Sequence, residues 1–339
     1  GLPIGLVGGS IISGAYFGDK MSPLSETTNM AAAVSGVDLF DHIKYMMLTT
    51  IPSFLITIII FLIIGFYFDT DISSQQISQA TEVIANKFTI SLWLFLVPLF
   101  VIVMIIKKIS AIPALLFGTI LGAIFAIIFQ PSIVIEISGM SSSNISSYYI
   151  GIVNSMIGDV NFNSVNTTIN DIFNIAIADR SDLLKSGGMY GMLNTLLLIF
   201  SAMIFSGSIE ATGLLNRVAY PIVEYAKSTG SLIASTATTC IFFNLTTSDQ
   251  YMSIVVPGRM YSKTYEEKEL APENLSRTLE DSGTVTSVLI PWNSCGATQS
   301  AVLGVATLAY LPFCFFNLIS PLMTIAYGYF GIKIKKLRK

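Results

Sequence analysis

The run Ser282–Ile332 reads SGTVTSVLIPWNSCGATQSAVLGVATLAYLPFCFFNLISPLMTIAYGYFGI and contains no Asp, Glu, Lys or Arg in 51 residues. A helix needs roughly 20 apolar residues to cross about 30 Å of hydrocarbon. The run is therefore too long for one crossing and fits two. Because Pro291 and several hydroxyl side chains interrupt its first half, we expect a broken helix over about 284–305 and a span over 308–332.

Four segments upstream are also apolar and free of charged residues. Each is long enough to cross a membrane as a helix. The expected spans cover residues 45–68, 88–106, 109–129 and 188–208. The sequence therefore predicts an all-α, multi-pass membrane protein.

The composition agrees with this class. Charged residues make up 12% of the 339 residues, where a soluble domain has about 25%, and the mean hydropathy is +0.70. The net charge of −3 offers no basic patch for nucleic acid. Three cysteines in apolar surroundings and a single histidine, His42, indicate no disulfide framework, zinc site or catalytic triad. We expect no cofactor and no transition metal.

Polar segments separate the spans and are predicted to be loops. Residues 69–87 and 136–187 are rich in Ser, Asn and Asp, and the second of these is expected to be an external loop. Residues 258–281 hold ten charges in 24 residues and are expected to form a cytoplasmic loop, and residues 333–339 a basic cytoplasmic tail.

The orientation follows from Lys and Arg, which gather on the cytoplasmic side. Residues 230–257 are uncharged over most of their length and rich in Ser and Thr. If they crossed the membrane fully, the charged loop after them would lie outside. If they form a re-entrant hairpin from the inside, 14 of the 18 basic residues face the cytoplasm, as does the C-terminal tail. We prefer the hairpin.

The two ends of the chain share a pattern. A glycine, Gly36 or Gly304, follows Pro23 and Pro291 at the same distance of 13 positions, and a span follows each. The predicted orientation of the two spans is opposite, which indicates an inverted repeat, the usual architecture of a secondary transporter.

In this arrangement the end of the first repeat covers residues 1–68, with a broken helix over about 14–37. Connecting spans occupy residues 69–135, and the second repeat covers residues 188–332. The hairpin that matches residues 230–257 would precede Gly1. Since the chain opens in apolar sequence without Met, we expect it to be truncated at the N-terminus.

The breaks carry the chemistry. Proline frees backbone carbonyls, and these with hydroxyl, amide and carboxylate oxygens form a hard-oxygen set suited to an alkali cation near the membrane midplane. An ionisable group at membrane depth is a functional candidate, so Asp19, Glu26 and Asp249 are predicted to couple ion and proton. The candidate ion ligands around them are Ser22, Ser25, Thr27, Thr28, Asn29, Asn244, Thr246, Thr247, Ser248, Asn293, Ser294 and Thr298.

Structural roles compete with these assignments. Asp19 can pair with the adjacent Lys20, and Asp249 can cap a half-helix at the hairpin tip. The hydroxyl groups can bond back to their own helices.

Four further polar or aromatic residues near the breaks are predicted to be structural. We expect Glu280 and Asp281 to cap the last broken helix, Trp292 to pack beside its break, and His42 to be a solvated loop residue.

Two segments resemble signatures of a known family. Gly14–Asn29 is similar to one signature of the NhaC-type Na⁺/H⁺ antiporters, and Asn274–Thr284 with Ile290–Gly296 is similar to its C-terminal one. The resemblance implies an inverted-repeat secondary transporter of the ion transporter superfamily, with a re-entrant hairpin and broken helices. By analogy it also implies an elevator-like motion and a homodimer. The family's first hairpin matches nothing in this sequence.

The expected function is exchange of Na⁺ for H⁺ across the cell membrane. Na⁺, H⁺ and membrane lipid are then the partners of the protein. The alternative is a Na⁺/H⁺-coupled antiporter of organic acids such as malate and lactate. The scarcity of bases at the breaks, where Lys20 stands alone, favours cation exchange. An intramembrane enzyme with Asp19 and Asp249 as paired acids is the alternative from another class.

Overall fold

The computed structural model of the chain describes residues 2–23, 25–68, 73–107, 109, 111–175, 182–213, 217 and 227–337. The chain divides into two compact units, which are described separately. One unit comprises residues 70–194, and the other comprises residues 2–69 together with residues 195–339.

The unit of residues 70–194 is built of helices with one small antiparallel strand pair, in which Val160 lies opposite Ser186. Its helices α7 and α8 pack tightly because Gly151 lies against the backbone of Val134. The elements are α4 (Ser74–Lys87), η1 (Leu92–Phe95), α5 (Leu96–Ile106), α6 (Ala111–Phe129), α7 (Pro131–Ser138), α8 (Ile145–Ile157), β1 (Val160–Asn161), α9 (Asn163–Ile172), β2 (Lys185–Ser186) and α10 (Gly188–Gly191).

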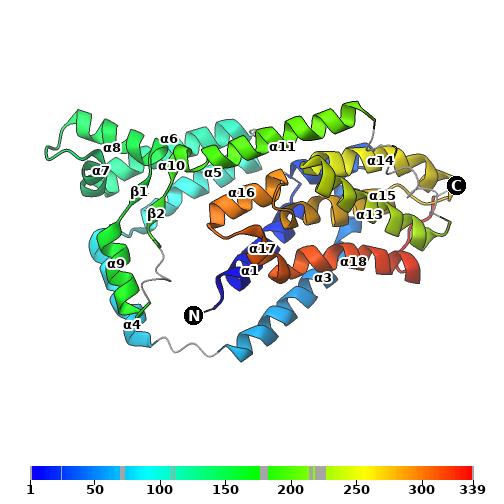
Figure 1. The fold of residues 1–339 in the computed structure, drawn as a ribbon, viewed down its shortest axis with the longest axis horizontal. Coiled ribbons are helices and arrows are strands. Elements are labelled where there is room, and N and C mark those ends of the chain that lie inside the picture. The colour runs from blue at the N-terminus through cyan, green and yellow to red at the C-terminus, as the bar shows by residue number, and fades with distance from the viewer. Residues whose placement is uncertain are drawn as a thin grey trace. The chain divides into compact units, whose positions relative to one another are not determined.

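The other unit is helical throughout its regular elements, and in Figure 1 helix α18 runs alongside α3 and α13. Its elements are α1 (Ile4–Lys20), α2 (Glu26–Ser35), α3 (Leu39–Tyr67), α11 (Leu193–Ala211, which begins at the boundary), α13 (Thr229–Thr247), α14 (Gln250–Glu267), α15 (Glu273–Leu279), the π-helical turn η3 (Glu280–Thr284), η4 (Ser287–Leu289), α16 (Ser294–Leu303), α17 (Thr307–Tyr310), η5 (Leu311–Phe313) and α18 (Phe315–Phe330).

Several helices are long and apolar enough to cross a membrane. Among the described residues, Leu39–Tyr67 and Ile112–Phe129 qualify by length and composition. Two bent pairs qualify if each pair is one span: α4 with η1 and α5, bent by 80°, and α17 and η5 with α18, bent by 55°. The expected all-α, multi-pass fold class is confirmed.

Helix α3 buries polar side chains and exposes apolar ones. Exposed positions include Leu55, Ile59 and Leu62. The buried positions recur every three to four residues along one face; they are His42, Met46, Thr49, Thr50, Ser53 and Thr57. This is the reverse of a soluble protein and fits a helix whose outer face meets lipid.

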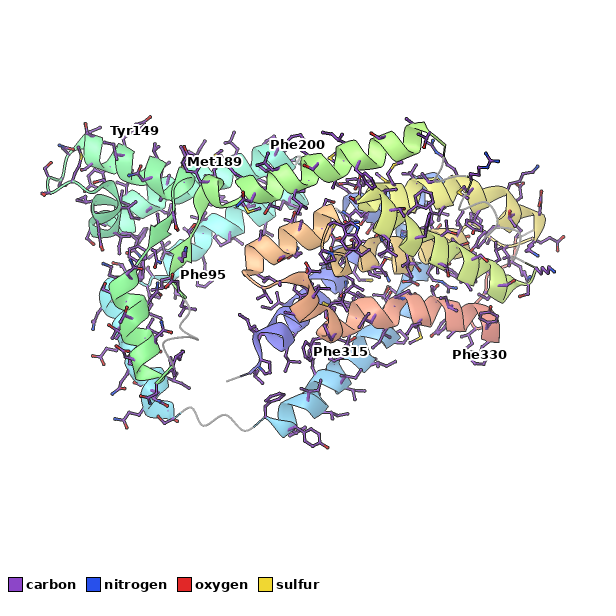
Figure 2. All side chains as sticks on the ribbon, viewed as in Figure 1. Phe95, Tyr149, Met189, Phe200, Phe315 and Phe330 are labelled. Atoms are coloured by element: carbon purple, nitrogen blue, oxygen red, sulfur yellow. The ribbon has the colours of Figure 1, made fainter. Side chains whose placement is uncertain are left out.

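Large apolar side chains are exposed over both units. Figure 2 marks several of them, among which Phe95, Met189, Phe200 and Phe330 are each more than half exposed. A soluble monomer rarely exposes apolar surface on this scale. These side chains therefore indicate lipid-facing surface on each unit.

Two helices are broken where prolines interrupt the sequence. The first break separates α1 from α2, and the second separates η4 from α16. The helices that follow the breaks match each other: α2 and α16 each have ten residues and end at a left-handed glycine, Gly36 (φ 71°) or Gly304 (φ 64°). The expectation of broken helices is confirmed, whereas the inverted repeat is not confirmed and stays a prediction.

The hairpin consists of α13 and α14, which pack against each other. Ser248, with a left-handed backbone (φ 60°), and Asp249 make the turn between them. Helix α14 continues through Pro257 to Glu267, so the second arm is longer than the expected end at residue 257.

The expected loop over residues 258–281 is wrong as a structural assignment. Its first part belongs to α14, and residues 273–281 form buried helix whose charges find partners far away in the sequence. The broken helix accordingly starts at Glu273 and not near residue 284. Counting charges over a stretch of sequence shows neither which residues these charged side chains pair with nor that the side chains are buried.

The other two expected loops also contain helices. Residues 74–87 form α4, which a capping box of Ser73 and Gln76 begins, and residues 136–187 include α8 and α9. Residues 69–72 and 176–181 of these segments lie outside the described residues, as do residues 338–339 of the tail. The membrane side of each segment stays a prediction.

Candidate functional site

Asp281 is the centre of a fully buried polar cluster. Its Oδ1 forms an ion pair with Nζ of Lys20, and its Oδ2 accepts a hydrogen bond from Oγ1 of Thr49 at 2.8 Å. The hydroxyl of Ser320 lies 3.3 Å from Oδ1 and accepts from Lys20 Nζ at 3.0 Å. All four side chains are shielded from solvent.

Glu280, the preceding residue, is equally buried but faces a different helix. Its Oε1 accepts hydrogen bonds from the hydroxyls of Thr27 (3.3 Å) and Thr28 (3.4 Å) at the start of α2. Among the described residues, its Oε2 has no hydrogen-bond partner. Thr28 also donates to the backbone oxygen of Lys20 at 3.2 Å, which links the end of α1 to the start of α2.

These residues together are called the buried carboxylate centre. It comprises Lys20, Thr27, Thr28, Thr49, Glu280, Asp281 and Ser320. They come from α1, α2, α3, η3 and α18, elements that contact one another in one unit.

The π-helical turn η3 positions the two carboxylates. Adjacent residues on a helix point about 100° apart, so Glu280 is directed at α2 while Asp281 is directed at α3 and α18. A π turn inserts an extra residue into a helix and is frequent at functional sites. Ser282 in the same turn has a buried hydroxyl that makes no hydrogen bond within the part of the chain that the structure describes.

A second layer ties the hairpin tip to the last break. Asn244 donates from Nδ2 to the Gly283 oxygen (2.6 Å) and to Thr286 Oγ1 (3.0 Å). Asn293 donates to Asn244, and the backbone N–H of Ser294 donates to the Ser248 oxygen at 2.8 Å. The predicted residues Asn244, Ser248, Asn293 and Ser294 are therefore brought together as a clamp.

The three predicted coupling carboxylates lie outside the buried carboxylate centre. Asp19 and Glu26 are exposed and Asp249 is half-buried. Tyr251 joins two of them, because its hydroxyl donates to Glu26 and its backbone N–H to Oδ1 of Asp249 at 3.1 Å. Asp19 interacts electrostatically with both Glu26 and Glu280. We call Asp19, Glu26 and Asp249 the acidic cluster.

Asp249 thus has the capping role that competed with its functional assignment, since it caps α14. Asp19 does not take Lys20 as its partner, because that ammonium group pairs with Asp281.

The other predicted hydroxyl and amide ligands divide into three groups. Ser25 contacts Thr27 at 3.0 Å, and so adjoins the buried carboxylate centre. Asn29 donates to the oxygens of Pro23 and Ser25 and braces the first break, where the backbone N–H of Ser22 donates to the Asp19 oxygen. In the third group, the hydroxyls of Thr246, Thr247 and Thr298 donate to carbonyls of their own helices.

Two predicted structural roles are wrong. Glu280 and Asp281 lie inside a continuous buried helix and direct their side chains at other helices, so neither caps a helix start. His42 is fully buried, and its Nδ1 lies 2.8 Å from Ser276 Oγ. Trp292 does lie beside its break and donates to the Leu245 oxygen at 2.8 Å.

The sequence pattern predicts Arg277 in a cytoplasmic loop, but its side chain is fully buried. Its guanidinium carbon lies 4.7 Å from the centroid of the Tyr45 ring and 5.8 Å from that of Tyr327. None of its three nitrogens has a hydrogen-bond partner among the described residues. The apolar row of Ala271, Leu275 and Leu279 gives no signal for this burial, because Arg277 lies two residues from Leu275 and from Leu279, on the other side of the helix.

The arrangement suits a small hard cation. Carboxylate and hydroxyl oxygens are the ligands such ions prefer. Across the described ranges, no group of three or more His, Cys, Asp or Glu side chains is arranged to hold a metal ion. The centre offers mixed carboxylate and hydroxyl oxygens, with an ammonium group as the resident positive charge.

The sequence comparisons agree with this chemistry. The family model described as "Na+/H+ antiporter family" matches residues 14–332. The Na⁺/H⁺ antiporter NhaC of Alkalihalophilus pseudofirmus is 37% identical over 99% of this chain and 67% of its own length. NhaC of Bacillus subtilis is 34% identical over 97% and 67%.

A third relative carries a different name. The malate-2H⁺/Na⁺-lactate antiporter of Bacillus subtilis is 32% identical over 98% of this chain and 65% of its own length. The chain thus spans about two thirds of the length of these relatives. No solved structure matches it significantly.

Proposed function

The chain belongs to the Na⁺/H⁺ antiporter family, and we propose that its activity is the exchange of Na⁺ for H⁺ across the cell membrane. It is then a transporter, and the buried carboxylates serve ion binding and not hydrolysis. The observation that supports this most is the buried carboxylate centre, where two adjacent carboxylates meet hydroxyls from α2, α3 and α18.

Na⁺ would be held chiefly by Asp281. The carboxylate already has two hydroxyl groups within hydrogen-bond distance, those of Thr49 and Ser320. Each of these hydroxyls has lone pairs that can face a cation. Glu280 Oε2 and Ser282 Oγ are buried oxygens that have no hydrogen-bond partner in the described ranges, and they give the centre further capacity to bind a cation or a proton.

The acidic cluster would serve as the approach to this centre. Asp19, Glu26 and Asp249 are open to solvent at least in part, and like charges gathered at one place raise the local concentration of cations. Asp19 lies within electrostatic range of Glu280. The role of the acidic cluster is therefore attraction of Na⁺, and that of the buried centre is binding and release.

Proton flux in sealed liposomes tests the function. The complete protein is reconstituted with a pH-sensitive dye inside, and an imposed Na⁺ gradient is expected to drive proton movement without any organic acid. Absence of Na⁺-driven proton movement in the unaltered protein would overturn the proposed function.

The variants Asp281→Asn and Glu280→Gln test the site in the same assay. Each is expected to reduce exchange to background. The matched control is Glu136→Gln, because Glu136 is a half-exposed carboxylate paired with Lys87 on the other unit. Full exchange by Asp281→Asn would remove the centre from the mechanism.

Arg277 supports a second candidate function, antiport of an organic acid coupled to Na⁺ and H⁺. A buried guanidinium without hydrogen-bond partners is suited to a carboxylate. It weakens the argument from scarce bases, which had favoured simple cation exchange. The second function replaces the first if two results are obtained. Proton movement must require malate or lactate, and Arg277→Lys must either remove that dependence on the organic acid or abolish proton movement.

The arrangement in the membrane is part of the proposal. We expect a multi-pass protein with a cytoplasmic C-terminal tail, residues 230–257 re-entering from the cytoplasmic side, and a homodimer. A cysteine introduced at Lys336 should react with an impermeant thiol reagent only from the cytoplasmic face.

A further inference from the structure

Arg277 carries a buried positive charge that needs a counter-charge. Its side chain is fully shielded from solvent, and its three nitrogens make no hydrogen bond to any described residue. A guanidinium keeps its proton at all accessible pH values, so this side chain cannot become neutral as a buried lysine can. Because an uncompensated charge is strongly unfavourable in a region of low dielectric, the buried arginine calls for an anion beside it.

The acidic side chains of the same helical segment are engaged elsewhere. Glu273, four positions before Arg277, forms an ion pair with Lys335. Asp281, four positions after Arg277, belongs to the ion pair of the buried carboxylate centre. Glu280 accepts hydrogen bonds from the start of α2. None of these three carboxylates therefore supplies the counter-charge of the guanidinium.

Two aromatic rings limit how an anion can approach Arg277. The guanidinium carbon lies 4.7 Å from the centroid of the Tyr45 ring and 5.8 Å from that of Tyr327. Rings stacked on a guanidinium cover its faces and leave the N–H groups at its edge. The Tyr45 hydroxyl is committed, because it donates to Oδ1 of Asn274 at 2.6 Å. An anion thus meets a fork of N–H donors, which suits a halide ion or a flat carboxylate group.

Thr324 adds a second unsatisfied group on the neighbouring helix. Its hydroxyl is fully buried and makes no hydrogen bond within the described part of the chain. Thr324 lies three positions before Tyr327 on α18, and side chains at this spacing are neighbours on a helix surface. The hydroxyl therefore lies beside the ring that contacts Arg277, where it can donate to an anion.

We propose that Arg277 and Thr324 form a binding site for a small monovalent anion. The ligand carries one negative charge on a group that fits the edge of a guanidinium. Two sources supply this chemistry, a free halide such as chloride and the carboxylate group of an organic acid. The anion neutralises the buried guanidinium, and the Thr324 hydroxyl donates a further hydrogen bond to it.

The anion binds cooperatively with Na⁺. Arg277 and Asp281 are four residues apart along α15 and η3, which corresponds to about 6 Å along a helix axis. Na⁺ adds a positive charge to a centre in which Lys20 already balances Asp281, and an anion one turn away restores neutrality. Each ion then raises the affinity of the protein for the other. This cooperative part rests on the proposed function, because it assumes that Na⁺ binds at Asp281.

Thermal unfolding without Na⁺ tests the anion site by itself. The complete protein in detergent is titrated with choline chloride, while the choline salt of a bulky sulfonate keeps the ionic strength constant. The unfolding temperature should rise with chloride and then level off, because binding to the folded state saturates. A general salt effect does not saturate and is shared by all variants.

A parallel titration with choline lactate distinguishes the two sources of the anion. A saturable response to chloride shows that a free halide fills the site. A response to lactate alone assigns the site to organic acids and favours the second candidate function.

Arg277→Met is the central variant, because it removes the charge but keeps a long, unbranched side chain. It should fold, since apolar residues often replace buried charges without loss of stability, and it should lose the saturable response. Thr324→Val keeps the side-chain shape and should raise the half-saturating concentration roughly tenfold. It serves the test even where Arg277→Met does not fold. The matched control is Arg259→Met, which removes an exposed arginine of α14 and should respond as the unaltered protein does.

Binding of isotopic Na⁺ measures the cooperation. The apparent Na⁺ affinity of the unaltered protein should be at least about fivefold higher in the saturating anion than in the sulfonate alone. Arg277→Met should show the same affinity in both salts. A Na⁺ affinity of the unaltered protein that is equal in both salts overturns the cooperative part.

Two outcomes overturn the site itself. One is an unfolding temperature of the unaltered protein that is the same in chloride, lactate and sulfonate; the other is a full saturable response by a folded Arg277→Met variant. Both leave Na⁺-driven proton movement in liposomes as it was measured. Failure of the unaltered protein to move protons with Na⁺ is a different result, because it removes the exchange and leaves the anion titration intact.

Discussion

Asn293 donates a hydrogen bond from Nδ2 to both the backbone oxygen (3.2 Å) and the side-chain oxygen (3.3 Å) of Asn244. Both amides are fully buried. The contact joins the tip of the α13–α14 hairpin to the break before α16, two segments that the sequence places 49 residues apart. It therefore holds the tip of the hairpin against the broken helix, next to the buried carboxylate centre.

Asn244→Ala should destabilise the protein, because the Asn244 amide also bonds to Gly283 and Thr286 in the last broken helix. The change removes two hydrogen bonds that Asn244 donates and leaves buried acceptors unpaired, which costs about 1–3 kcal/mol in free energy of unfolding. Thermal unfolding followed by fluorescence of the two tryptophans measures it. Thr298→Ala removes a hydroxyl whose bond, within the described part of the chain, is to its own helix, and it should change stability by no more than about 0.5 kcal/mol. Equal stability of the two variants would contradict the clamp.

Gly9→Ala should disturb the packing of α1. An added Cβ would lie 2.5 Å from Cβ of Phe313 and 2.6 Å from its backbone oxygen, and overpacking of this kind costs about 1–3 kcal/mol. Gly14→Ala is the matched control on the same helix, because nothing lies within 4 Å of its added Cβ. Thermal stability should fall for Gly9→Ala alone, and exchange should fall with it because α1 carries Lys20.

Thr49→Val should weaken Na⁺ binding while preserving side-chain shape. It removes the hydroxyl that donates to Asp281 Oδ2, a loss of about 1–2 kcal/mol or roughly tenfold in apparent affinity. The control is Thr57→Val on the same face of α3, since the hydrogen bond that its hydroxyl makes among the described residues is to the Ser53 oxygen. Isotopic Na⁺ binding compares them, and equal affinities would exclude Thr49 as a ligand.

The acidic cluster should act through its charge. Asp249→Asn keeps the cap, because an amide oxygen can still accept from the Tyr251 N–H, yet it removes the charge. The apparent Na⁺ affinity should fall by a factor of about two to five at low ionic strength, and Asp19→Asn should behave likewise. Added choline chloride should shrink the difference. Asp159→Asn on the other unit is the control; a defect that persists in high salt would instead indicate direct ligation.

The sequence predicted the breaks and the hairpin because their signals are local. Pro23 and Pro291 lie at the breaks, the two glycines end the helices that follow, and the turn at Ser248 and Asp249 ends a run of Ser and Thr. The predicted ligands Thr27 and Thr28 do reach the buried carboxylate centre. These features depend on residue types within a few positions of one another.

The central ion pair could not be predicted in this way. Lys20 and Asp281 are 261 residues apart, and each has a nearer alternative, Asp19 for the lysine and a helix cap for the aspartate. The charge count over residues 258–281 also places Asp281 in a charged loop. In the structure, the exposed residues of this window lie between residues 259 and 269, whereas residues 273–281 are buried. Lys20 and Asp281 are buried because they pair with each other in the folded protein. The sequence around either residue does not show that pairing.

The reversed pattern of α3, with hydroxyls inside and aliphatic side chains outside, has a thermodynamic consequence. In a bilayer those aliphatic side chains meet lipid both before and after the helices separate, so unfolding transfers little apolar surface to water. The heat capacity of unfolding, which scales with apolar hydration, should be small for this unit. Its stability should then vary almost linearly with temperature, without the curvature that leads soluble domains to cold denaturation.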